Sequence, residues 1–199
     1  MVNQNSQGKL DSVFWDSRWK EGRTGWDLGQ ASPALTAYFD QRTDKHVSIL
    51  IPGCGSAYEA SYLVNNGFTD ITLLEISKEA AIRLRKKFEF LPQVKVLEQD
   101  FFDHEGQYDL IVEQTFFCAL DPLLRPRYVS HARDLLNAGG KLMGLLFDRE
   151  FDEPGPPFGG AAEDYQKLFS PHFKIKTMER CYNSIPPRQG HEVFVLLTK

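Results

Sequence analysis

The sequence contains few cysteines, no long hydrophobic run and no excess of positive charge. Its three cysteines (Cys54, Cys118 and Cys181) lack the spacing of metal ligands, and an odd number fits a reducing compartment better than a disulfide scaffold. No apolar segment approaches the length of a membrane span, and the first residues, MVNQNSQGKLDS, lack the pattern of a signal peptide. The net charge of -4 gives no electrostatic reason to expect nucleic acid or an anionic membrane as a partner. We therefore expect a cytoplasmic protein without metal, and nothing in the sequence requires more than a monomer.

Short apolar segments alternate with segments of helical pattern along the chain. Its 199 residues suffice for one domain with a substantial core, so we expect a single domain over 1–199. Expected strands are 46–51, 68–76, 93–100, 108–114 and 141–147, with helices at 57–67, 77–90, 122–137 and 161–170 and a terminal hairpin at 173–182 and 191–199. This alternation predicts an α/β, Rossmann-like fold with a mostly parallel seven-stranded sheet and helices on both faces.

A turn with two glycines follows the first expected strand, in the segment IPGCGSAYEA. Gly53 and Gly55 lie where the chain passes from a buried strand into a helix, so a ligand can approach bare backbone there. The third glycine of the dinucleotide fingerprint is absent, because Tyr58 stands three residues after Gly55. Taken alone, the turn is explained equally well as a tight connection.

Acidic side chains follow the second and third expected strands. Glu75 stands 22 residues past Gly53, where a carboxylate can accept hydrogen bonds from both ribose hydroxyls of an adenosine. Asp100 can accept from an adenine amino group, and Phe101 can flank the ring. Because the carboxyl ends of parallel strands share one edge, these residues together indicate a nucleoside ligand, although Glu75 could also be a solvated acid. With no third glycine and no lysine-bearing phosphate loop, S-adenosylmethionine is favoured over NAD or ATP.

All three tryptophans precede the first strand, in the segment FWDSRWKEGRTGW. Trp15 and Trp19 share one face of a short helix that is predicted to begin at Asp11 or Ser12, and Trp26 follows in a glycine-containing turn. A hydrophobic stripe packed on the sheet is the ordinary explanation of this spacing. The alternative is an N-terminal lid over residues 1–30, in which the indoles exclude water and face a sulfonium cation.

Several separated segments, in the same order, resemble the thiopurine S-methyltransferase superfamily from about Phe14 to the C-terminus. They are FWDSRW, TGWDLG, IPGCGSAYEA, the acid Glu75, FFCALDPLLRPRY and GPPFG, of which FFCALDP is most similar to the plant halide and thiol methyltransferases. The resemblance implies the class I methyltransferase fold with S-adenosylmethionine as cofactor. The residues that it implies or supports as cofactor-binding are Trp15, Trp19, Trp26, Gly53, Gly55, Glu75, Asp100, Phe101, Gln114 and Arg125.

Two of these assignments carry qualifications. Arg125 is expected to contact the cofactor carboxylate, which is a natural use of a guanidinium, but it could also be a surface arginine in the segment RPR. At the position of Gln114, plant halide and thiol members tend to carry Tyr and thiopurine enzymes tend to carry Arg. The resemblance therefore does not pass an acceptor preference to this chain.

The expected reaction is methyl transfer to a small, soft nucleophile such as a thiol, hydrosulfide, thiocyanate or halide. These acceptors are anionic or nearly so, and the sequence offers no obvious His/Asp dyad, so no catalytic base is predicted. Phe117 and Phe158 are predicted to wall the acceptor pocket, and Arg188 to attract an anionic acceptor. Since neighbours in sequence point apart, one of Phe116 and Phe117 is expected in the core.

Two further residues and two other functions are open at this point. His191 is the one histidine near the expected site, and Cys118 is interpreted as a buried thiol, because no base stands near it in sequence. An O- or N-methyltransferase of a small metabolite would need a proton acceptor that the sequence does not reveal. A domain that binds S-adenosylmethionine without catalysis is the non-enzymatic alternative.

Overall fold

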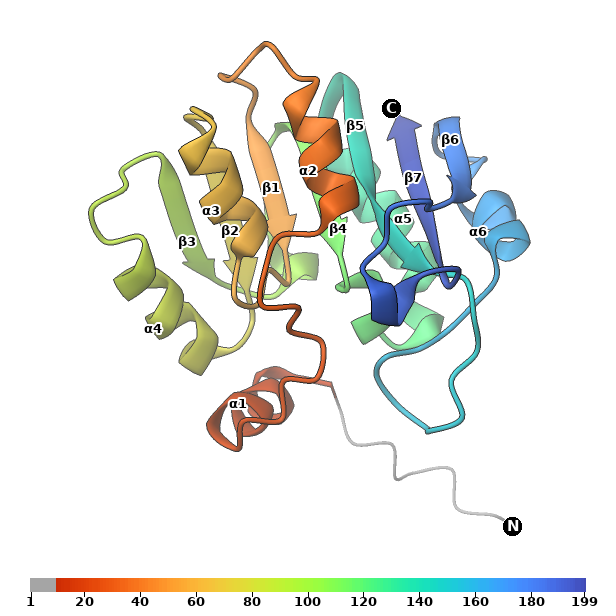
Figure 1. The fold of residues 1–199 in the computed structure, drawn as a ribbon, viewed down its shortest axis with the longest axis horizontal. Coiled ribbons are helices and arrows are strands. Elements are labelled where there is room, and N and C mark those ends of the chain that lie inside the picture. The colour runs from red at the N-terminus through yellow and green to blue at the C-terminus, as the bar shows by residue number, and fades with distance from the viewer. Residues whose placement is uncertain (1–9) are drawn as a thin grey trace.

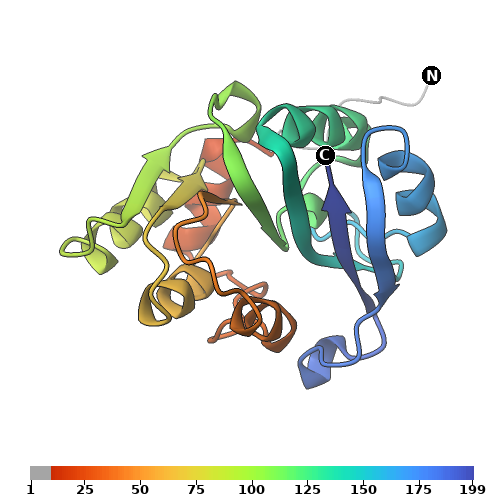
Figure 2. The same ribbon diagram turned by 90° about the horizontal axis from the view of Figure 1, so that it is seen from above.

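The computed structural model describes residues 10–199, and the first nine residues of the expected lid lie outside that range. Seven strands form one sheet with helices on both faces (Figures 1 and 2). The strands are β1 (Ile49–Pro52), β2 (Ile71–Glu75), β3 (Val94–Glu98), β4 (Tyr108–Gln114), β5 (Leu136–Phe147), β6 (Lys174–Arg180) and β7 (Glu192–Thr198). The α-helices are α1 (Ser12–Lys20), α2 (Pro33–Asp40), α3 (Tyr58–Asn65), α4 (Lys78–Lys87), α5 (Arg125–Asp134) and α6 (Ala162–Phe169), and the 3-10 helices are η1 (Phe101–Asp103), η2 (Phe117–Ala119), η3 (Pro122–Leu124) and η4 (Pro186–Arg188).

The strand order is β3-β2-β1-β4-β5-β7-β6, and β1 to β5 pair in parallel. Strand β7 inserts between β5 and β6 and is antiparallel to both, so the predicted terminal hairpin and the predicted fold are confirmed. Two elements differ from the prediction. Helix α2 was not predicted, although Ser32 followed by Pro33 is a helix-start signal. Strand β5 begins at Leu136 instead of at the expected residue 141. Gly139 and Gly140, which were expected to follow the end of a helix, lie inside the strand, where its pairing with β4 is irregular.

The core consists of two apolar clusters, one on each face of the sheet. Leu35, Leu63 and Leu84 from α2, α3 and α4 belong to the first cluster, and Tyr128 and Phe169 from α5 and α6 belong to the second. Strands β1 and β2 are buried at every position, which explains their nearly continuous apolar sequence.

The carboxyl ends of β1 to β5 share one edge of the sheet, at the bottom in Figure 1. Helix α1 lies below this edge, on the side of α4, and the loop between β5 and α6 lies below its other half (Figure 1). Open α/β sheets bind their ligands at this edge. None of the helices within residues 10–199 combines the length and the apolar character that crossing a membrane requires.

Candidate active site

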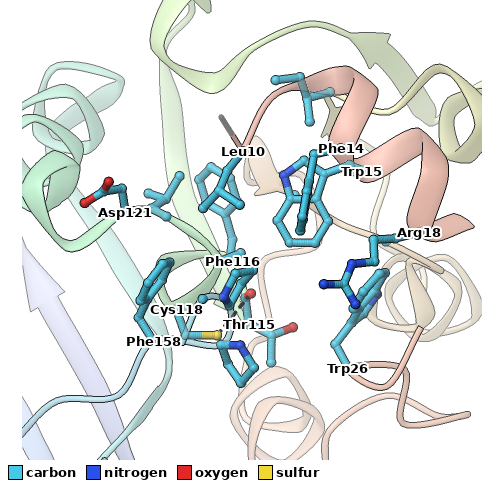
Figure 3. A pocket seen from close by; sticks show the side chains of 18 of the residues that line it. Leu10, Phe14, Trp15, Arg18, Trp26, Thr115, Phe116, Cys118, Asp121 and Phe158 are labelled. Carbon is cyan, nitrogen blue, oxygen red and sulfur yellow. Dashed lines mark hydrogen bonds between the residues drawn. The ribbon is translucent and has the colours of Figure 1, made fainter. Parts of the chain in front are cut away.

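A cavity of about 1050 Å³ opens at the carboxyl edge of the sheet. Its walls come from α1, the glycine turn after β1, the ends of β2, β3 and β4, the segment after β5 and the turn before β7. Figure 3 shows Phe14, Trp15 and Arg18 of α1 on one side, Cys118 and Phe158 on the other, and Phe116 between them. A cavity of this volume is at the upper end of the range of small-molecule sites.

The glycine turn requires glycine at both predicted positions. Gly53 has φ +55° and Gly55 has φ +52°, a left-handed conformation that side chains rarely adopt. A Cβ on Gly53 would also fall on the ring of Phe116, so the missing side chain lets this ring pack against the turn. Both glycines line the cavity, so bare backbone is exposed to it at this turn.

Glu75 ends β2 at the cavity wall and is buried, with 6% of its surface exposed. Its Oε1 accepts a hydrogen bond from the Ser77 backbone N–H (2.9 Å), and its Oε2 accepts one from the Gly55 backbone N–H (3.2 Å). Burial raises the pKa of Glu75 to about 7, although these N–H groups act in the opposite direction. The carboxylate is thus held in place by backbone while it faces the cavity.

Asp100 and Phe101 follow β3 and also line the cavity. Asp100 Oδ1 accepts from the Phe102 backbone N–H (2.9 Å), which caps η1 and fixes the direction of the side chain. Phe101 is nearly buried and packs edge-on against the ring of Phe116, with ring centroids 5.2 Å apart. Phe101 therefore serves the core and the wall together.

The three indoles meet each other at the cavity. Trp15 and Trp19 of α1 both make edge contacts with Trp26, with centroid distances of 5.5 and 5.8 Å. Trp19 is buried at 8% exposure, while Trp15 and Trp26 are half-buried. All three line the cavity, and Figure 3 shows Trp15 and Trp26 beside Arg18. Trp19 therefore packs as the hydrophobic-stripe explanation expects. All three tryptophans also stand where a lid over the cavity would place them.

The two polar residues at the end of β4, Glu113 and Gln114, lie in different environments. Glu113 is fully buried, and its Oε1 accepts from the backbone N–H groups of Phe116 and Phe117 (both 2.8 Å) while its Oε2 accepts from the Tyr128 hydroxyl (2.8 Å). Gln114 lines a smaller neighbouring cavity of about 40 Å³, together with Trp26 and Gly55. Within the described residues both polar atoms of its amide are buried without a hydrogen-bond partner.

Comparison with known proteins identifies the relatives of this site. The family model for thiopurine S-methyltransferase matches residues 10–196. The chain belongs to the thiopurine S-methyltransferase family. A probable thiol methyltransferase 2 from Arabidopsis thaliana is 32% identical over 198 residues, which cover 96% of this chain and 85% of that protein. A thiocyanate methyltransferase 1 from Brassica oleracea is 28% identical over 184 residues, with 89% of this chain and 81% of that protein covered.

Solved structures support the fold. Magnesium protoporphyrin IX methyltransferase from Synechocystis PCC 6803, solved with bound S-adenosylmethionine, superposes with a TM-score of 0.72 at 15% identity, covering 95% of this chain and 97% of that one. The 1,6-didemethyltoxoflavin-N1-methyltransferase of Burkholderia thailandensis gives a TM-score of 0.71 at 16% identity, with coverages of 94% and 86%. This member of the thiopurine S-methyltransferase family is therefore an S-adenosylmethionine-dependent methyltransferase, as predicted.

The residues at the cavity fit this cofactor chemically. Glu75 presents a fixed carboxylate for ribose hydroxyls, Asp100 presents one for an adenine amino group, and the glycine turn offers unobstructed backbone. The indole faces suit a sulfonium cation. The unpartnered amide of Gln114 beside the glycine turn suits the amino-acid end of the cofactor.

Two predicted site residues lie elsewhere in this family member. Arg125 is outside the set of described residues that line the cavity, and it donates from Nη2 to the backbone oxygens of Phe158 (3.3 Å) and Gly159 (2.9 Å). Phe117 is in the core at 1% exposure, under the Arg125 guanidinium, whose carbon lies 4.7 Å from the ring centroid. The residue that lines the cavity is its neighbour Phe116. The backbone of Thr115 is left-handed (φ +60°) and leads into the 3-10 helix η2, and the rings of Phe116 and Phe117 point in different directions there.

Arg188 and Phe158 do line the cavity, but Arg188 is not an isolated cation. Its Nη1 lies 3.3 Å from Glu192 Oε1, and its Nη2 donates to the Trp26 carbonyl oxygen (3.1 Å). Glu192 is itself 3% exposed, so the pair is close to neutral inside the protein. The attraction for an anion expected from Arg188 is correspondingly reduced.

Three further wall residues were not predicted as such. Arg18 stands three residues after Trp15 and so on the same helix face, a spacing from which it could have been found. Its guanidinium lies over Phe14 and forms no ion pair with any carboxylate of the part of the chain that the structure describes. Cys118 lines the cavity, and burial raises its pKa to about 12, so the thiol stays protonated at neutral pH. Phe147 completes the aromatic wall, with Arg188 over its ring.

Proposed function

We propose that this enzyme transfers the methyl group of S-adenosylmethionine to a small, soft, thiol-type nucleophile, with thiol or hydrosulfide ahead of halide. The observation that carries the proposal is the continuous cavity from the glycine turn and Glu75 to the aromatic wall of Phe116 and Phe158. A polarizable, weakly hydrated acceptor suits such a wall better than a strongly hydrated one. The names of its relatives, thiol and thiocyanate methyltransferases, support the same acceptor class.

The enzyme residues act by binding, orientation and exclusion of water. When bound, S-adenosylmethionine supplies the methyl group on a sulfonium, which leaves the protein to place the acceptor in line with it. Glu75, Asp100 and Phe101 hold the nucleoside, and Gln114 holds the amino-acid end. Trp15, Trp19 and Trp26 cover the site and face the cation, so that the reacting atoms meet without water between them.

The acceptor must arrive as an anion or lose its proton to solvent. Four acids on the cavity wall already accept backbone N–H groups, namely Asp11, Glu75, Asp100 and Asp121. We propose Arg18 as the cation that attracts the anion, because it lies beside the indoles Trp15 and Trp26 (Figure 3). Like Arg127 and Arg149 on the same wall, it has no acidic partner among residues 10–199. We further propose that the enzyme works as a cytoplasmic, single-domain monomer. A small molecule is the proposed substrate because the cavity has a suitable volume, and nucleic acid is not expected because the net charge is -4.

The test is a pH series with thiols of different acidity. If the thiolate is the species that reacts, kcat/KM should rise with pH up to the pKa of each thiol itself, near about 8.5 for an alkyl thiol and lower for an aryl thiol. A screen with labelled S-adenosylmethionine over hydrosulfide, thiols, thiocyanate and halides would rank the acceptors. One common enzyme pKa across all thiols would instead reveal a general base, for which His191 on the cavity wall is available. That result would favour an O- or N-acceptor.

A further inference from the structure

Helix α1 carries the indoles, yet hydrophobic burial does little to fix it. Of its nine residues only Trp19 is buried, and Val13 is 74% exposed. A helix held by so little apolar surface needs other ties to stay in one position over the cavity. Two aspartates of the lid, Asp16 in α1 and Asp27 after Trp26, supply such ties, and both lead to Glu75.

Asp16 connects α1 to the start of α4. Its Oδ1 accepts from the Ser77 hydroxyl (2.6 Å) and from the Glu79 backbone N–H (3.1 Å). Ser77 is fully buried and is the N-cap of α4, where its Oγ also accepts from the Ala80 N–H. The backbone N–H of this same Ser77 donates to Glu75 Oε1 (2.9 Å). One residue therefore joins the lid to the carboxylate at the ribose position.

Asp27 connects the other end of the lid to the glycine turn. Its Oδ1 accepts from the Gly29 N–H (2.7 Å), and its Oδ2 accepts from the Ser56 hydroxyl. Ser56 directly follows Gly55, whose N–H donates to Glu75 Oε2 (3.2 Å). Each oxygen of Glu75 is thus held by backbone that is tied, at Ser77 or beside Gly55, to an aspartate of the lid.

We infer that Asp16 and Asp27 are positioning residues that couple the closed lid to the orientation of Glu75. A ligand that binds Glu75 then favours the lid position in which the indoles cover the cavity, and the closed lid in turn strengthens the grip of Glu75. The lowered pKa of Asp16 is consistent with this tie: burial raises it, but hydrogen bonds from Ser77 and Glu79 outweigh that effect. The inference rests on the proposed cofactor site. It adds a coupling between the lid and Glu75, and the cofactor could bind at this site without that coupling.

The test measures binding of S-adenosylhomocysteine by calorimetry in three variants. Asp16→Ala should weaken binding about tenfold, the loss expected for hydrogen bonds to a charged group. Asp16→Asn should stay within about threefold of the wild type, because its Oδ1 still accepts from Ser77 and Glu79. Asp109→Ala is the matched control: Asp109 binds Ser48 and Asn137 away from the lid, so its loss should lower stability and leave S-adenosylhomocysteine affinity unchanged.

Coupling through Glu75 is tested by a double-mutant cycle. In a Glu75→Gln background, Asp16→Ala should cost at most about threefold, since the group that it positions is already altered. The inference is overturned if Asp16→Ala loses stability as Asp109→Ala does but binds like the wild type, or if its tenfold loss persists in the Glu75→Gln background. If Asp16→Ala does not fold, the same binding measurement is made on Asp27→Ala, which removes the hydrogen bond between the lid and Ser56. Failure of the cofactor site itself would be separate, because Glu75→Ala would then bind like the wild type.

Discussion

Glu75 and Glu113 are two buried carboxyls whose pKa is raised to about 7 by burial, yet they do different work. Glu113 lies outside the set of described cavity-lining residues, and its three hydrogen bonds connect the turn after β4 to Tyr128 of α5. Glu75 accepts hydrogen bonds from the backbone N–H groups of Gly55 and Ser77 and faces the cavity. A carboxylate has about four lone-pair sites, so Glu75 retains accepting capacity toward a ligand.

We predict that Glu75→Ala weakens S-adenosylhomocysteine binding by more than tenfold, because charge-assisted hydrogen bonds are worth about 1.5–3 kcal/mol each. Ribose hydroxyls favour the ionised carboxylate, so wild-type affinity should rise with pH and level off above about 7, where Glu75 is ionised without ligand. Calorimetry from pH 5.5 to 8.5, as about five points, measures both effects. Glu75→Gln is the control and should lose the pH dependence; unchanged affinity in a folded Glu75→Ala protein would remove Glu75 from the site.

Glu113→Ala is predicted to lower the free energy of unfolding by about 3 kcal/mol or more, because two backbone N–H groups and the Tyr128 hydroxyl lose their buried acceptor. Glu113→Gln keeps an oxygen for both N–H groups and should cost much less. The folded-state pKa lies above the ordinary value of 4.5, so the wild type should lose stability as pH rises from about 4.5 to 7. Urea unfolding at several pH values measures this loss. In Glu113→Gln the free energy of unfolding should fall less steeply with pH than in the wild type, but it should still fall, since Glu75 titrates in the same range.

At the scale of elements, the turn after β1 combines a left-handed backbone with a close ring contact. Gly53→Ala should therefore destabilise the protein more than Gly67→Ala, whose φ is +83° but whose Cβ would meet no atom within 4 Å. Both variants share the backbone penalty of about 1–2 kcal/mol. Only Gly53→Ala adds the displacement of Phe116, worth about 1–3 kcal/mol by analogy with overpacked cores. If urea unfolding shows equal losses of free energy of unfolding in the two variants, the ring of Phe116 can move aside at no measurable cost.

The positions of most strands could be predicted because their apolar runs, such as those of β1 and β2, separate buried strands from crossover helices. Gly53, Gly55 and Glu75 could be placed because strand ends converge on one edge whatever the side-chain details. Phe116 and Phe117 could not be distinguished, since their directions depend on the left-handed backbone of Thr115. Arg125 follows β4 as expected, but its target, the carbonyls of residues 158 and 159, lies 33 and 34 residues away. Contacts of that range, like Asp16 with Ser77, leave no local pattern in the sequence.

At the scale of the whole molecule, the placement of tryptophan makes the lid separately observable. All three tryptophans lie at positions 15, 19 and 26, whereas the seven strands and the helices α2 to α6 contain none. Fluorescence therefore reports on the lid, and far-ultraviolet circular dichroism reports mainly on the remaining secondary structure. Since α1 buries little apolar surface, its local opening should require less free energy than global unfolding.

We predict that without ligand the fluorescence transition precedes the circular dichroism transition on heating, because the lid releases first. S-adenosylhomocysteine at about 100 times its Kd adds roughly 2.7 kcal/mol to the folded state, which for a chain of this length raises Tm by about 5–10 °C. Because the proposed site brings the ligand into contact with the lid and Glu75 together, the ligand should also bring the two transitions into coincidence. Asp109→Ala, remote from the lid, should lower the circular dichroism transition and leave the fluorescence transition nearly unchanged, so that the separation between them narrows. Coincident transitions in the unliganded protein would mean that α1 unfolds only with the sheet, and the tryptophans would then belong to the cooperative core rather than to a lid.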